Sequence, residues 1–454
     1  TPLERWIRWL DGRAKKGIVY PSAAVEARVS FSMAAALMIH RPAHPRVRWW
    51  WERALTHQRD AGDVSLALQS LSVAAGYYFM LGDIAGRKSV VRDIHALARM
   101  PQASPLAQLT WKWLEAAIGI WALMTPDQAL GKIMEALAYA EATGVHVWDH
   151  MLFALGVYGS LMKDDLERGR EFIGNLERTL APSRRHGYCH YHYLIAWERL
   201  LAGDLAAAKT SAETALNLAE ETGYQFPVIL CSLELVQALL GLGSAGGAAA
   251  HAARAHDLAL RSKSVVLEYM ALLAKAQVAL SRGHDASGLR SLREGLRLGR
   301  EQGYVNQLWW RHPPSLSRLC ARALDAGIEV EYVRGLITRH RLRPDRASVP
   351  PEAWPWPVKV LTLGRFRLEA GGKPLTFSGK VQKKPLDLLK ALIAFGGDEV
   401  TEGQITDALW PEAEGDAGRL SFKSALHRLR QLLGADDAVM YRDGRVGLDP
   451  RLCW

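Results

Sequence analysis

Two pairs of histidines are the residues in this chain whose type and spacing best suit binding chemistry. His146 and His150 lie four residues apart, and His186 and His190 repeat that spacing forty residues later. Histidines at positions i and i+4 share one face of a helix, and two such pairs on stacked helices can surround zinc or another borderline metal. When protonated, the same imidazoles would attract an anion instead. Further donors nearby in the sequence are Asp149, Cys189 and His192.

Packing is the main alternative for these histidines. Aromatic side chains surround them, namely Trp148, Tyr188, Tyr191, Tyr193 and Trp197. Histidines among aromatic residues often only fill a helical core and satisfy backbone groups. We therefore predict no metal and no cofactor. Packing and contact with an effector remain the two alternatives for these residues. The residues of that hypothesis are His146, His150, His186, His190, Trp148 and Tyr191.

A second group of residues suits contact with a polyanion. In a helix predicted from about Asp416 to Leu433, one stripe is apolar, and the remaining faces carry four Lys or Arg residues against one Asp. Such a helix suits phosphate, and side chains pointing away from the core can reach base edges in a major groove. A solvated basic surface is the alternative. The predicted DNA contacts on this helix are Arg419, Lys423, Ser424, His427, Arg428 and Arg430.

The residues after this helix predict a β-hairpin. Val439 to Tyr441 and Val446 to Leu448 flank an Asp-Gly turn at Asp443, which is among the strongest short-range hairpin signals. Arg442 and Arg445 bracket the turn, where a wing touches phosphate or minor groove, so both are predicted DNA contacts. A basic helix followed by such a hairpin predicts a winged helix.

The elements in front of the basic helix complete a small domain. Apolar residues alternate from Val358 to Leu368, which predicts two strands, and a third short strand is predicted from Pro374 to Phe377. Helical spacing resumes at Leu386 and ends at a Gly-Gly pair. Thr401 then has the character of a cap for a helix that ends at Trp410-Pro411.

This terminal segment resembles the OmpR-like winged helix of SARP-type transcriptional regulators. The resemblance covers about a fifth of the chain and implies that the basic helix reads direct-repeat promoter elements through Lys423, Ser424, His427 and Arg428. In the SARP pattern a helical domain follows the winged helix, whereas here the helical part precedes it. The matching residues are Leu363 to Phe366, Lys383 to Pro385, Leu388-Leu389, Gly396, Val400-Thr401, Leu409 to Pro411, Ser421, Ala425-Leu426, Arg428 to Arg430 and Val446 to Asp449.

The helical part carries a repeat of forty residues. The same turn recurs at Gly203, Gly243 and Gly283, and a second turn recurs at Gly144, Gly223 and Gly303. A fixed period of this length indicates stacked helix pairs that bury their faces on one another and form a superhelix with a concave surface. Six or more units are expected over roughly residues 40 to 320.

The repeats resemble the tetratricopeptide-like arm of MalT-type activators, in which the arm holds the effector site and a signal-transduction ATPase domain precedes it. The nearest approach to a phosphate-binding loop here, Gly82 to Ser89, lies within the repeat phase and is interpreted as a helix-pair turn. Because the chain begins at Thr1, we expect it to be the C-terminal portion of a longer regulator.

Composition fits a multi-domain protein of the cytoplasm. The chain has 454 residues, 49% of them hydrophobic, a net charge of +10 and four scattered cysteines, so neither a disulfide framework nor a Cys-x-x-Cys metal site is indicated. No apolar run approaches membrane-spanning length, and no signal peptide precedes the first helix, so no membrane partner is expected. The motifs of hydrolases and metalloproteases do not occur, and we expect no enzymatic activity.

The sequence therefore predicts a mainly α protein. Residues 1–340 are predicted to form an α-solenoid of tetratricopeptide-like helix pairs, 341–357 a proline-rich linker, and 358–454 an α+β winged helix. The expected function is a transcriptional activator whose arm senses a small effector or partner protein in the repeat groove. Expected partners are double-stranded promoter DNA and RNA polymerase, and self-association on activation is left open. The alternative is a protein-interaction scaffold whose winged helix contacts proteins.

Overall fold

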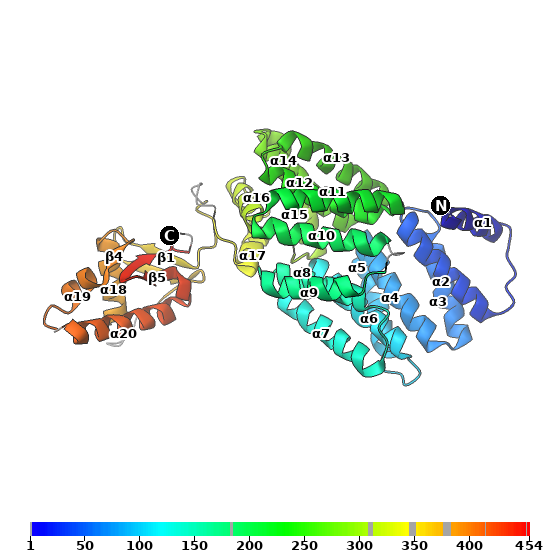
Figure 1. The fold of residues 1–454 in the computed structure, drawn as a ribbon, viewed down its shortest axis with the longest axis horizontal. Coiled ribbons are helices and arrows are strands. Elements are labelled where there is room, and N and C mark those ends of the chain that lie inside the picture. The colour runs from blue at the N-terminus through cyan, green and yellow to red at the C-terminus, as the bar shows by residue number, and fades with distance from the viewer. Residues whose placement is uncertain are drawn as a thin grey trace. The chain divides into compact units, whose positions relative to one another are not determined.

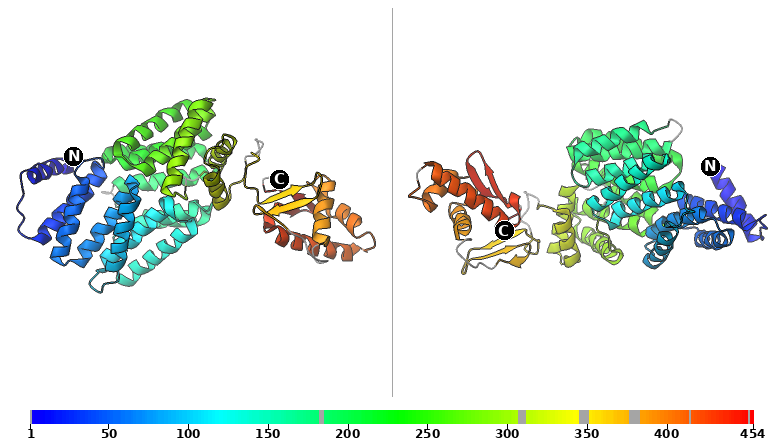
Figure 2. Two further views of the ribbon diagram at one scale, coloured as in Figure 1. Left: turned by 180° about the vertical axis from the view of Figure 1, so that it is seen from behind. Right: turned by 90° about the horizontal axis from the view of Figure 1, so that it is seen from below.

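The computed structural model of the chain describes residues 2–181, 185–306, 312–344, 351–375, 383–413, 415–450 and 452–454. They form two compact units. The first consists of Thr1–Ser315 and Ala326–Tyr332, and the second of Leu316–Asp325 and Val333–Trp454. Helices make up the first unit, and the second adds strands to helices (Figures 1 and 2).

The first unit is a succession of antiparallel helix pairs, as the repeat period predicts. The forty-residue spacing fits units of two helices of up to eighteen residues each. The helices are α1 (Pro2–Lys15), α2 (Ala23–His40), α3 (Val47–Ala61), α4 (Val64–Leu81), α5 (Ile84–Leu97), α6 (Pro105–Ile118), α7 (Pro126–Thr143), α8 (Asp149–Leu161), α9 (Leu166–Arg178), α10 (Arg185–Ala202), α11 (Leu205–Thr222), α12 (Gln225–Gly241), α13 (Ala245–Ser262), α14 (Val265–Ser281) and α15 (Asp285–Gln302), with a π-helical turn, η1 (Gly119–Leu123), after α6.

The repeated glycines mark the turns between helices. Gly203, Gly243 and Gly283 have φ between +73° and +85°, a region in which a side chain is strained. Gly223 and Gly303 adopt the left-handed conformation at the ends of α11 and α15. Lys263 takes that conformation midway between them, at the end of α13, so the backbone repeats even where the residue type does not.

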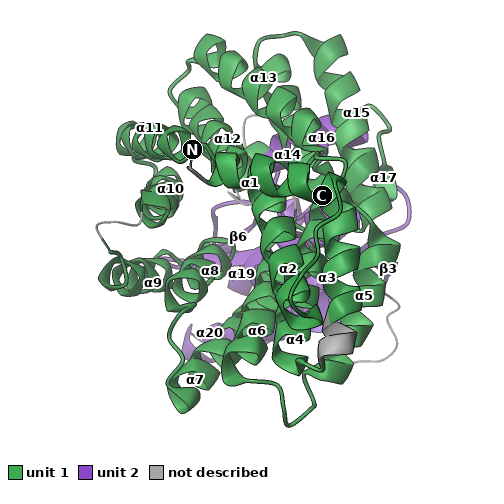
Figure 3. Cartoon of the chain, turned by 90° about the vertical axis from the view of Figure 1, so that its right-hand side faces the viewer, with its two compact units in different colours: residues 1–315, 326–332 green, residues 316–325, 333–454 purple. Residues whose placement is uncertain are grey.

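The even-numbered helices form an inner layer. Contacts join α2 to α4, α4 to α6, and so on through α14, while each odd-numbered helix packs beside its even partner. Viewed end-on, α9, α11 and α13 lie outside α8, α10 and α12 (Figure 3). Every residue of α12 from Pro227 to Leu239 is buried, as expected for a helix covered on all sides.

The superhelix closes on itself. Helix α14 contacts α4, and α12 contacts α2. Beyond α15, the Asn306 side-chain amide donates hydrogen bonds to the carbonyl oxygens of Ile120 (2.7 Å) and Met124 (2.9 Å). Tyr304 packs edge-on against Phe79 of α4. These contacts join the last helices of the array to the first ones across its concave side.

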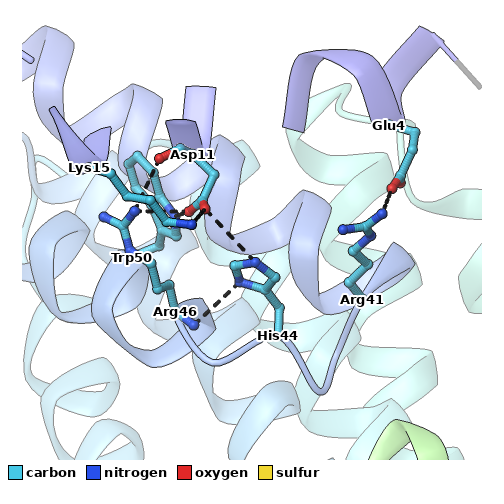
Figure 4. Close-up of polar contacts among 7 residues, drawn as sticks. All are labelled: Glu4, Asp11, Lys15, Arg41, His44, Arg46 and Trp50. Atoms are coloured by element: carbon cyan, nitrogen blue, oxygen red, sulfur yellow. Dashed lines mark hydrogen bonds and ion pairs between the residues drawn. The ribbon is translucent and has the colours of Figure 1, made fainter. Parts of the chain in front are cut away.

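A polar cluster attaches α1 to the next helix pair (Figure 4). The Asp11 side chain is almost fully buried and accepts from the Arg46 guanidinium at 3.1 Å. Lys15 Nζ lies 3.4 Å from the same carboxylate, and the Trp50 indole donates to it at 3.5 Å. Glu4 pairs with Arg41 at the other end of α1.

Helix α4 is an exception to the expectation about apolar runs. It is long and apolar enough to cross a membrane by length and composition alone, so the sequence-based statement was wrong for this helix. Half of that stretch is buried inside the structure, including Leu68, Ala74 and Phe79. It packs against α2, α3, α5, α6 and α14, which accounts for its apolar character as that of a core helix.

The second unit contains part of α16 (Pro313–Asp325), most of α17 (Val330–His340) and a small α+β domain. Strands β1 (Val358–Leu361), β2 (Arg367–Ala370) and β3 (Lys373–Pro374) form one antiparallel sheet, and β4 (Val400–Thr401), β6 (Arg445–Leu448) and β5 (Val439–Arg442) form another in that order. The helices are α18 (Lys383–Ala394), α19 (Glu402–Leu409) and α20 (Gly415–Leu433), followed by the 3-10 turn η3 (Asp436–Ala438).

The terminal domain follows the predicted order of elements. Thr401 caps α19, its hydroxyl accepting from the backbone N–H of Gln404 at 3.2 Å. Asp443 and Gly444 both have positive φ, as a two-residue hairpin turn requires. Of the predicted third strand, Pro374 pairs with β2 as part of β3; Thr376 and Phe377 lie outside the described residues, as do 345–350 of the predicted linker. The predicted domain boundaries stay a prediction.

A single core holds this domain together. The apolar stripe of α20 is buried against α18 and against strands of both sheets. The buried members from α20 are Phe422, Ala425, Leu426, Leu429 and Leu433. Burying this stripe leaves the opposite faces of α20 to solvent.

Candidate functional site

A cavity of about 610 Å³ lies within the array and is the candidate effector site. The inner helices α2, α4, α6, α8, α10, α12 and α14 all contribute to its wall, together with η1. Its aromatic lining comprises Tyr77, Trp113, Trp121, Trp148, Tyr158, Tyr193, Tyr224 and Phe226. A mostly apolar cavity with a few polar groups is the usual form of a small-ligand site.

The structure brings three of the four predicted histidines together at this cavity. His150 on α8 and His186 and His190 on α10 all line it. The rings of His186 and His190 lie 6.5 Å apart, and His190 Nε2 is hydrogen-bonded to the Tyr158 hydroxyl at 3.2 Å. Burial lowers the pKa of His190 to about 3 and also lowers that of His186. Both imidazoles are therefore neutral near pH 7, which disfavours the capture of an anion by protonated histidines.

His146 and Tyr191 are placed away from the cavity lining. His146 is half exposed, and its Nδ1 lies 2.9 Å from the Asp149 carboxylate. The Tyr191 side chain is partly buried, and burial together with a hydrogen bond to Glu177 raises its pKa to about 12. Only three of the four predicted histidines therefore lie at the cavity. Among the described residues, no group of three or more His, Cys, Asp or Glu side chains has metal-binding geometry.

Trp148 lines the cavity and is held firmly. Its indole stacks on that of Trp113 with ring centroids 4.1 Å apart and an interplanar angle of 8°. The Trp148 N–H donates to the Thr110 hydroxyl at 2.9 Å. A ring fixed by stacking and by a hydrogen bond presents a rigid apolar surface to the cavity.

Three further residues lie at or near the cavity: Cys189, which the sequence suggested only as a nearby donor, and Cys231 and Glu234, which it did not suggest as site residues. Cys189 and Cys231 both line it, and their sulfur atoms lie 3.9 Å apart as free thiols. Their separation of 42 residues is close to one repeat period, a signal that could have found the pair. Glu234, one helical turn beyond Cys231, is 1% exposed, and no hydrogen bond to either of its carboxyl oxygens is found among the described residues.

A separate hollow of about 670 Å³ lies beside α5, α6 and η1. Its lining includes the cations Arg87, Lys88 and Arg92. This is the segment that approaches a phosphate-binding loop in sequence. In the structure Gly82 ends α4 in the left-handed conformation, and Asp83 caps α5, so the segment is a helix-pair turn as predicted.

The candidate nucleic-acid surface lies on α20 and the terminal hairpin. Lys423, Ser424, His427 and Arg428 are all exposed on the side of α20 that faces away from the core. Arg442, at the start of the hairpin turn, is exposed as well. The helix thus offers basic and polar side chains to solvent, with its first turn carrying only Asp416 as an acid.

Three other predicted contacts have partners within the domain. Arg419 Nε lies 3.2 Å from Glu402, and Arg445 Nε lies 3.5 Å from Glu399; both arginines remain more than half exposed. The Arg430 guanidinium donates two hydrogen bonds to the Val439 carbonyl, at 2.8 and 3.1 Å. Arg430 therefore joins α20 to the hairpin, a role that the sequence did not indicate.

Comparison with known proteins bears on the fold. No protein-family model matches the chain, and no curated protein matches it significantly. The chain is similar to the crystal structure of a Rap protein complexed with competence and sporulation factor, with a TM-score of 0.50 and 10% identity over 70% of this chain and 87% of that one. The apo form of RapI gives a TM-score of 0.37 at 8% identity, covering 90% of this chain and 99% of that one.

The first of these similarities shows an array of tetratricopeptide-like helix pairs, in agreement with the predicted fold class. At 10% identity it shows the fold and nothing more. The resemblance of the terminal domain to SARP-type regulators, and of the whole arrangement to MalT-type activators, stays a prediction.

Proposed function

We propose that this chain is a non-enzymatic regulator in which the helical array binds an effector or partner and the terminal domain, a winged helix, binds promoter DNA. The cavity in the inner layer of the array supports the binding of an effector or partner. Seven inner helices and η1 converge on it, so a bound molecule would contact units far apart in sequence. Binding there can therefore change how the whole superhelix packs.

The fold likeness supports partner binding by the array. The similar Rap protein was crystallised with competence and sporulation factor, and an array of the same fold here contains a cavity large enough for a small organic molecule or a few residues of a peptide. We infer that the occupant of the cavity is of that size.

DNA binding rests on the exposed face of α20. Lys423, His427 and Arg428 project from a helix whose other side is committed to the core. In a winged helix the corresponding helix enters the major groove while the hairpin touches the backbone. Arg442 at the hairpin suits that second contact. RNA polymerase would then be the downstream partner of an activator.

An interaction scaffold is the second candidate, and the fold likeness favours it. The similar Rap structure is a complex with a factor and says nothing of DNA. In that case the array would bind a protein partner, and the exposed face of α20 would contact protein in place of phosphate. Salt dependence separates the candidates, because DNA binding releases counterions from the duplex.

The test measures binding of the full chain to mixed-sequence duplexes by fluorescence anisotropy across a range of salt concentrations. The proposal expects a log–log salt slope of several units, and a loss of about two units in the double variant Lys423→Ala/Arg428→Ala. The double variant Arg365→Ala/Arg367→Ala is the matched control, since it removes the same charge from exposed positions in the β1–β2 turn and at the start of β2. A duplex affinity that does not change with salt concentration would favour the scaffold. So would an equal loss of salt slope in the two double variants.

A further inference from the structure

The cavity in the array has no fixed positive charge with which to hold an anion. Its lining contains no Lys, Arg, Asp or Glu among the described residues. Burial keeps the pKa of His190 at about 3, lowers that of His186 and raises the pKa of Tyr158 and Tyr193, so these four lining groups are uncharged near pH 7. An anionic ligand would lose its hydration there without gaining a counterion, which is unfavourable.

Aromatic faces and a buried acid favour the opposite charge. Indole and phenol rings attract cations through their negative faces, and this attraction strengthens when water is excluded. Glu234 lies three and four residues beyond Cys231 and Leu230 on α12, on the same face of the helix, and both of those residues line the cavity. Glu234 is not itself part of the lining, but it lies one helical turn from that part of the cavity, and its charge acts on the lining residues Tyr158 and Tyr193.

The surroundings of Glu234 leave its carboxyl in need of a donor. The titratable groups that sense its charge are Tyr158 on α8, Tyr193 on α10 and Cys231 on α12, while Cys189 on α10 acts on Glu234 itself. None of these four is a cation. Burial raises the pKa of Glu234 well above its ordinary value, which favours the protonated form of the unliganded carboxyl. An unsatisfied buried polar group is destabilising, and a ligand that donates to it would remove that cost.

We propose that the cavity takes a ligand with one basic nitrogen on an aromatic-sized apolar body, and that Glu234 is the counterion of that nitrogen. This inference rests on the proposed role of the cavity as the effector site. On binding, the protonated amine keeps its proton, and the Glu234 carboxyl releases its own proton to solvent, so that an ammonium–carboxylate pair forms inside the cavity. The hollow beside α5 is lined by three cations, Arg87, Lys88 and Arg92, against one acid, Glu115, so its net positive charge suits such a ligand less well.

The test compares three indoles of similar size on the full chain: tryptamine as the cation, tryptophol as the neutral analogue and indole-3-propionate as the anion. Calorimetric titration should show tryptamine binding at least about tenfold more tightly than the other two, which corresponds to about 1.4 kcal/mol. Titration in two buffers of different ionisation enthalpy should reveal the release of about one proton per amine bound. In E234Q both the preference and the proton release should disappear, while weak tryptophol binding remains.

Two controls keep the outcomes separate. Glu171→Gln removes an exposed acid on α9 and should behave as the parent chain. Ala35→Trp adds an indole to the cavity wall from α2 and should abolish binding of all three compounds. If tryptophol or indole-3-propionate binds the parent chain as tightly as tryptamine, the cavity is a ligand site but the counterion role of Glu234 is wrong. If none of the three binds at about 10 mM, or if binding survives Ala35→Trp, the ligand class is overturned while the DNA-binding arm of the proposed function is untouched.

Discussion

The Tyr158 hydroxyl lies 3.2 Å from Nε2 of His190, and both side chains line the cavity. This pair ties α8 to α10 at the point where the two helices line the cavity. Because the imidazole is held in an apolar environment, its neutral form is the one that the fold accepts.

Replacing His190 should make the stability of the folded chain depend less on pH below pH 6.5. Its pKa falls from 6.5 in the unfolded chain to about 3 in the folded one, so its contribution is fully present above pH 6.5 and is lost as the pH falls toward 3. The loss from one such group is up to about 1.4 kcal/mol per pH unit. His190→Gln cannot take up this proton, and its melting temperature should vary less between pH 6.5 and 4 than that of the parent chain.

His284→Gln is the control for this measurement, because His284 is exposed at the start of α15 and should leave the profile unchanged. A His190→Gln profile that runs parallel to that of the parent chain over this range would mean that the imidazole is protonated in the fold.

Removing the buried carboxyl of Glu234 should stabilise the unliganded array. Glu234→Met fills the same space without an unsatisfied polar group, and we expect a gain of about 1–3 kcal/mol at pH 7. Since burial raises the pKa of Glu234, the folded state is favoured most below the ordinary carboxyl pKa of 4.5 and loses stability as the pH rises through the raised value. The gain in Glu234→Met should therefore grow with pH.

The measurement is urea unfolding of the array followed by circular dichroism at several pH values. Glu171→Met, at an exposed position of α9, should change stability by no more than about 0.5 kcal/mol. A destabilised Glu234→Met would show that the carboxyl has a partner in the fold and would weaken the case for a ligand counterion.

The array was predictable because its geometry repeats. One turn every forty residues, with glycine at Gly203, Gly243 and Gly283, sets the helix boundaries and the stacking order. The same period would have paired Cys189 with Cys231, which lie one unit apart. The repeat period also predicted that His150, His186 and His190 lie on neighbouring inner helices. It predicted the same for His146, which the structure places away from the cavity lining.

The contacts between the last and the first helices of the array could not be predicted from the sequence. Whether α14 meets α4 depends on small rotations between successive units, which add up over the whole array and leave no local pattern. The burial of Glu234 could not be predicted for the same reason. An acidic residue in a helix is expected to face solvent unless the packing of the neighbouring helices is known. Likewise, the bond from Arg430 to the Val439 carbonyl depends on how the hairpin returns to α20.

Substitution of Asp11 should release α1 from the array. Its buried carboxylate binds Arg46 and accepts from Trp50, so Asp11→Ala leaves a cation half-buried without its counterion. Breaking such a pair costs about 3 kcal/mol. Hydrogen exchange in α1 should accelerate markedly, whereas Glu4→Ala, which breaks a more exposed pair with Arg41, should have a much smaller effect. Unchanged exchange in Asp11→Ala would mean that the apolar contacts of α1 suffice to hold it.

Neighbouring arginines on α20 should have opposite phenotypes. Arg428 is exposed, so Arg428→Ala should weaken duplex binding and lower the salt slope by about one unit with little effect on stability. Arg430 donates twice to the Val439 carbonyl, and Arg430→Ala should lower the stability of the terminal domain by about 1–2 kcal/mol. At temperatures where that variant is folded, its salt slope should match that of the parent chain. If Arg430→Ala instead lowers the slope and leaves the melting temperature unchanged, the guanidinium contacts phosphate and its bond to Val439 is dispensable.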